Sequence, residues 1–80
     1  MAEHRVTFVL TCINAPSVVV SFEPEGAHHT LHRGDCFRVE MVGPDVGEPE
    51  ISYTPNGVIV GAWSRAETRV RNRAGENLPT

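Results

Sequence analysis

Lysine is missing from this sequence of 80 residues, and all seven basic side chains are arginines, against ten aspartates and glutamates. A GC-rich coding sequence would explain this bias. The alternative is selection for bidentate contacts with anions, which arginine makes better than lysine. The formal net charge of −3 argues against a generic nucleic-acid binder, because such proteins are usually basic.

The sequence also has no run of about 18 apolar residues, so it predicts no transmembrane helix and no membrane partner. The N-terminal segment carries Glu3 and shows no apolar region followed by a small-residue cleavage pattern. We therefore expect no signal peptide and a cytoplasmic location.

Cysteine is scarce. Cys12 and Cys36 are too few for a disulfide scaffold, and each lies in an apolar, strand-like segment. The favoured interpretation is two free thiols that act as small apolar side chains. A disulfide or a reactive thiol is the alternative.

Helical periodicity is absent as well, whereas alternation of polar and apolar residues with period two is common. Turn residues recur at short intervals, for example Asn14-Ala15-Pro16 and Gly43-Pro44-Asp45. We predict a single all-β domain over residues 1–80, a small antiparallel β-sandwich or barrel of about six to seven short strands. The expected strands are approximately residues 5–13, 17–23, 28–32, 36–42, 49–54, 57–63 and 67–72.

Three features refine this prediction. Residues 6–13 and 18–22 are apolar on both faces, so they form central strands or cover a partner interface. Asn56-Gly57 suggests a tight hairpin with positive φ at both turn positions. The last residues, 76–80, are expected to fray.

The order of strands and turns over about residues 18–78 resembles a family of small bacterial all-β proteins without assigned function. The matching positions are Leu31, Gly34, Phe37, Val39, Gly43, Pro44, Trp63, Val70, Gly75 and Leu78. The chain departs from the family pattern at residues 23–26, where a tryptophan is expected, and at residues 64–66, where Pro-Gly-Ser is expected. The resemblance implies a compact all-β fold and no activity.

Three histidines lie between Gly26 and Gly34, but strand geometry argues against a metal site. On a strand, His28 and His32 share a face but lie about 13 Å apart, at a rise of about 3.3 Å per residue. Zinc–nitrogen bonds are only about 2.0–2.1 Å long, so both rings cannot reach one ion without a sharp bend. His28 and His32 are therefore weak metal candidates, and we expect no cofactor.

The segment Thr68–Arg73 alternates arginine with other residues, which places Arg69, Arg71 and Arg73 on one face of a strand. Trp63 and Arg65 come shortly before it, and these five residues are the predicted binding surface. An aromatic side chain beside basic groups is typical of single-stranded nucleic-acid binding. A solvated edge strand protected by charge is the simpler interpretation.

These observations favour a small non-enzymatic binding or assembly module that acts through protein–protein contacts and forms a homo-oligomer. A nucleic-acid accessory protein that uses the arginines is the alternative. A metal-dependent or thiol enzyme comes third. Cys36 lies near the histidines in sequence, but no motif supplies an oxyanion hole or an orienting third group.

Overall fold

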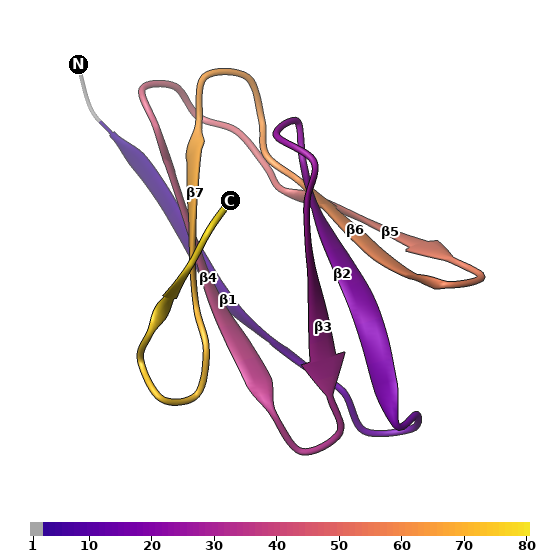
Figure 1. Ribbon diagram of the computed structural model, residues 1–80. Helices are drawn as coiled ribbons and strands as arrows, with labels where there is room; N and C mark the ends of the chain where they lie inside the picture. Colours follow the sequence, from indigo (N-terminus) through magenta and orange to yellow (C-terminus); the bar gives the residue numbers. More distant parts are fainter. Residues whose placement is uncertain (1–2) are drawn as a thin grey trace.

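The alternating segments fold into short strands, as the computed structural model of residues 3–80 shows (Figure 1). The described chain contains no helix long and apolar enough to cross a membrane. The strands are β1 (His4–Thr11), β2 (Ser17–Glu23), β3 (Ala27–His32), β4 (Cys36–Gly43), β5 (Glu50–Thr54), β6 (Gly57–Gly61), β7 (Glu67–Arg71) and β8 (Asn77–Leu78).

These strands form two four-stranded sheets in a sandwich-like arrangement. Sheet A has the order β1-β4-β7-β8, and sheet B has the order β3-β2-β6-β5. The sheets do not close on each other among residues 3–80, so the barrel alternative is wrong. The all-β sandwich is confirmed.

One strand pair departs from the antiparallel prediction. β2 and β6 run parallel, with Val20 beside Val58 and Phe22 beside Val60, whereas the other five pairs are antiparallel. Parallel neighbours need a long connection. Here the connection between β2 and β6 includes β3 and β5 of sheet B and β4 of sheet A.

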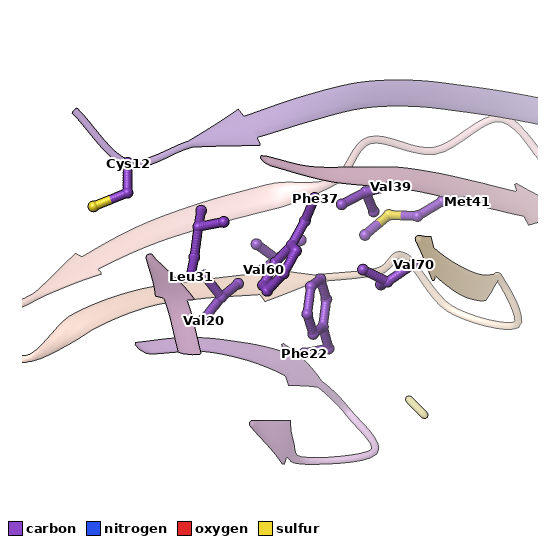
Figure 2. Packing of buried hydrophobic residues seen from close by; sticks show 9 residues of the cluster. All are labelled: Cys12, Val20, Phe22, Leu31, Phe37, Val39, Met41, Val60 and Val70. Atoms are coloured by element: carbon purple, nitrogen blue, oxygen red, sulfur yellow. The ribbon is translucent and has the colours of Figure 1, made fainter. Parts of the chain in front are cut away.

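The core lies between the inner faces of the two sheets, where β2 and β4 contribute most of the buried side chains (Figure 2). Phe37, Val39 and Met41 point inward from β4, and Arg38 and Glu40 point outward, as the alternation predicts. The buried apolar residues are Cys12, Val20, Phe22, Leu31, Phe37, Val39, Met41, Val60 and Val70.

Two strand assignments need correction. Of the two segments that are apolar on both faces, only β2 is central. In the described chain, β1 is an edge strand that pairs with β4 alone, so the central-strand alternative is wrong for residues 6–13 and the interface alternative stays a prediction. The segment expected to fray contains β8, in which Leu78 pairs with Val70 and Asn77 pairs with Arg71.

The β5–β6 hairpin also differs from its predicted geometry. Thr54 pairs with Gly57, so the central turn residues are Pro55 and Asn56. Neither Asn56 nor Gly57 has a positive φ, because the two-residue loop is shifted by one position from the expected Asn-Gly turn. Proline is suited to the first central position of such a turn.

Candidate functional site

The outer face of sheet A carries a group of arginines from three strands. Val39 and Val70 point into the core, so their neighbours in sequence point to solvent. We call this surface the arginine face and define it by Arg5 of β1, Arg38 of β4, and Arg69 and Arg71 of β7. Arg5 and Arg38 were missed in the sequence analysis, because the residues flanking each of them do not form an arginine row.

One row across the sheet is neutralised internally. Thr7, Glu40 and Arg69 are register partners on β1, β4 and β7. The Glu40 carboxylate accepts a hydrogen bond from Arg5 and lies 3.9 Å from the Arg69 guanidinium. Glu40 therefore contacts two arginines of the arginine face, and Glu67, 3.8 Å from the Arg69 guanidinium, supplies the second negative charge.

The next row is different. Here Val9, Arg38, Arg71 and Asn77 are register partners on β1, β4, β7 and β8. Neither Arg38 nor Arg71 forms an ion pair with any carboxylate of the described residues. The Arg71 Nε–H donates a hydrogen bond to Asn77 Oδ1 over 3.2 Å.

A hollow of about 100 Å³ lies between these two rows. It is lined by Thr7, Arg38, Glu40, Arg69 and Arg71. The arginine face therefore has a neutralised row, a cationic row and a hollow between them.

Arg73, the third residue of the predicted arginine row, lies beyond the end of β7. Its guanidinium donates a hydrogen bond to the Gly34 carbonyl oxygen over 3.0 Å and lies 3.8 Å from the Asp35 carboxylate. Arg73 thus links the β7–β8 turn to the β3–β4 turn. Only Arg69 and Arg71 of the predicted row share a strand.

Trp63 and Arg65 lie in the β6–β7 loop, at the opposite end of β7 from Arg71. A Cβ placed on Gly47 would lie 2.1 Å from Trp63 Cγ, so the indole is packed directly against the backbone of the β4–β5 loop. The ring of Trp63 also makes an edge contact with His4, with centroids 5.5 Å apart. The structure therefore does not bring Trp63 to the arginine face.

Arg65 is also separated from the arginine face. It has a φ of +70°, and its guanidinium lies 3.7 Å from Asp45. A positive φ is uncommon for a residue other than glycine, and here it occurs within the tight turn between β6 and β7. Arg65 and Trp63 belong to the loops at one end of the sandwich.

The histidines are spread over both faces of β3. His28 points outward and bonds to Ser21, with Oγ and Nδ1 2.8 Å apart. His29 points inward, with its ring near Phe22 and Phe37. His32 is exposed, and residues 3–80 contain no group of three or more His, Cys, Asp or Glu placed to hold a metal ion.

Both cysteines are free thiols. Cys12 is buried and its Sγ is 3.3 Å from the Ala15 carbonyl oxygen. Cys36 is half-buried on the outer face of sheet A, and its backbone N–H bonds to Asp35.

The edge of β1 is the second distinctive surface. This strand is eight residues long, and one of its two hydrogen-bonding edges has no partner strand in the described chain. Val6, Phe8 and Leu10 point inward but stay only half-buried, and Val9 on the outer side is 47% exposed. Apolar side chains therefore continue up to an open edge.

Comparison with protein-family models finds no match, and neither curated proteins nor solved structures give a significant match. Of the resemblance over residues 18–78, the structure bears out the all-β fold.

Proposed function

We propose that this protein is a non-enzymatic assembly module that pairs with a second copy of itself through the open edge of β1. The observation that carries the proposal is the eight-residue β1 strand, which among the described residues has a partner strand on one side only. An edge strand presents a row of unpaired N–H and C=O groups, which form a template for another strand.

The other sheet edges are less suited to this pairing. β8 has two residues, and β5 has five residues between Pro49 and Pro55. Short edge strands and flanking prolines are common protections against pairing. β3 is six residues long and places the polar side chains of His28, Thr30 and His32 on its outer face.

Two copies of β1 are self-complementary. In antiparallel pairing about a two-fold axis, each residue faces a residue from the same side of the partner sheet. The half-buried Val6, Phe8 and Leu10 would therefore meet the same set of side chains from the partner and extend both cores. A chain of 80 residues buries a smaller fraction of its surface than a larger domain, so this additional burial adds to its stability.

The nucleic-acid alternative has less support. Single-strand binding combines a basic groove with stacking aromatics. Here Trp63 is packed against Gly47 and is separated from Arg69 and Arg71. A protein partner is therefore the better match for the surfaces that the fold exposes.

The test is the substitution Val9→Lys. Val9 lies on β1 beside the open edge, where a lysine resists pairing with a second strand. Sedimentation equilibrium at micromolar concentration should give a dimer for the native chain and a monomer for Val9→Lys. Circular dichroism should show that both proteins are folded.

Val19→Lys is the matched control. Val19 is a valine of similar exposure, 41%, on the central strand β2, away from any edge. This variant should remain a dimer. A native chain that is monomeric at high concentration contradicts the proposal, and so does equal dissociation by the two lysines.

A further inference from the structure

We propose that Arg38 and Arg71 form a clamp for a carboxylate of an acidic protein segment. This inference goes beyond the self-assembly proposed above and is independent of it. Edge-to-edge pairing of β1 would leave the outer face of sheet A open to solvent. The clamp can therefore act in a monomer or in a dimer.

The first argument is the repulsion between the two arginines. They are direct register partners on adjacent antiparallel strands, where opposing Cβ atoms lie about 4.5–5.5 Å apart. Like charges in this position are destabilising. An anion placed between Arg38 and Arg71 would relieve that repulsion, because no carboxylate of the described residues does so.

The second argument is preorganisation. Asn77 accepts the Nε–H of Arg71, which fixes the guanidinium and leaves its terminal N–H groups for a ligand. Thr7 adds a hydroxyl group to the lining of the hollow. A held guanidinium loses less conformational freedom on binding, so more of the contact energy appears as affinity.

The third argument is size. The hollow of about 100 Å³ has room for one carboxylate and a few waters, since a water takes about 30 Å³ in the liquid. Arginine presents a planar fork of donors that matches a carboxylate bidentately. Two such forks, from Arg38 and Arg71, can hold the two oxygens of one carboxylate.

Charge and chemistry favour an acidic protein segment over a nucleic acid. Glu40 borders the hollow and Glu67 lies on the same face, so a continuous polyphosphate backbone would meet two carboxylates. The described outer face of sheet A also carries no aromatic side chain on which a base could stack. An isolated glutamate or aspartate side chain meets only Glu40, whose charge is paired with Arg5 and Arg69, and it needs no stacking partner.

The experiment measures binding of a capped peptide of alternating glutamate and serine by the full chain at low salt. Arg38→Gln and Arg71→Gln should each weaken binding about tenfold, the loss expected for one charge-assisted contact. Arg33→Gln is the control: it removes the same charge from an arginine of the β3–β4 turn, whose Nε–H donates to the Ala15 carbonyl oxygen in the β1–β2 loop. Its affinity should stay within about twofold of the native value.

Side-chain NMR provides the structural readout, because the Nε–H signals of Arg38 and Arg71 should shift on titration with the peptide. A peptide with glutamine in place of glutamate should not bind. Equal weakening by Arg33→Gln would mean a general charge effect and would overturn the clamp. Tighter binding of an oligothymidylate or of inorganic phosphate, lost in the same two variants, would overturn the carboxylate assignment.

Discussion

The carbonyl oxygen of Val19 lies so close to Gly57 that a Cβ placed on this glycine would stand 2.1 Å from it. The two residues are register partners where β2 and β6 run parallel. Gly57 therefore permits the close approach that starts this parallel pair. Its backbone φ is not positive, so the glycine is needed for space and not for conformational freedom.

We predict that Gly57→Ala destabilises the protein by about 1–3 kcal/mol, the range for forcing extra atoms into a packed site. The clash is with backbone and cannot be relieved by a side-chain rotation. Urea unfolding followed by circular dichroism measures the change. The same strand offers a control in Gly61, where a Cβ would meet only the Glu50 carbonyl oxygen at an ordinary 3.7 Å.

Gly61→Ala should therefore be neutral or should stabilise the chain by up to about 1 kcal/mol, because alanine reduces the entropy of the unfolded state. Equal stability of the two alanine variants would contradict this prediction, because it would show that the contact between Val19 and Gly57 leaves room for a side chain.

A second prediction concerns Trp63, which packs flat against Gly47. Gly47→Ala should displace the indole, since the added Cβ would lie 2.1 Å from its ring, and this should cost about 1–3 kcal/mol. Trp63 is the only tryptophan, so its fluorescence reports the change directly. Gly26→Ala is unsuitable as a control because of its positive φ, whereas Gly61→Ala should leave the emission unchanged.

Much of the fold follows from local patterns. The alternation in residues 36–42 predicts the inward Phe37, Val39 and Met41, and the structure confirms all three. The expected strand at residues 17–23 is also found with those bounds. In residues 36–42 one face is buried and the other is exposed to solvent, so period two appears in the sequence itself.

Long-range pairing could not be predicted in the same way. The neighbours of a strand depend on which distant segments share a sheet, and this left the parallel β2–β6 pair and the edge position of β1 unforeseen. β8 was missed because its two residues carry no pattern of their own. Long-range pairing also explains why Arg38 was not predicted beside Arg71. The two residues are distant in sequence and become neighbours only through the β4–β7 register.

A third prediction separates the two thiols. Cys12 is 5% exposed, whereas Cys36 is only half-buried, so a thiol reagent should modify Cys36 much faster in the folded protein. Ellman's reagent should release one equivalent of chromophore quickly and the second only on unfolding. Cys36→Ser should remove the fast phase, and rapid release of both equivalents would contradict the burial of Cys12.

A fourth prediction tests whether the arginines are needed for folding. Arg69→Gln and Arg71→Gln together should change the free energy of unfolding by less than about 1 kcal/mol, as for other exposed substitutions. Arg69 contributes an exposed ion pair of small value, and loss of Arg71 relieves its repulsion with Arg38. A larger loss, measured by urea unfolding, would mean that the arginines are structural.

The last prediction concerns Asn77, which positions Arg71 from β8. Asn77→Asp keeps an acceptor oxygen at the same place and adds a negative charge, so Arg71 gains an ion pair within the sheet. Exposed ion pairs contribute about 0.2–1 kcal/mol, so the stability of the folded chain should stay equal or rise slightly. The acidic peptide should bind several-fold more weakly, because the new carboxylate competes for the same guanidinium. Stability and peptide affinity therefore move in opposite directions, which general damage to the β7–β8 hairpin would not produce.

The control is Asn77→Gln, measured with the same peptide, which should weaken binding less because it adds no charge. Unchanged peptide affinity in Asn77→Asp would show that Arg71 is not part of the clamp.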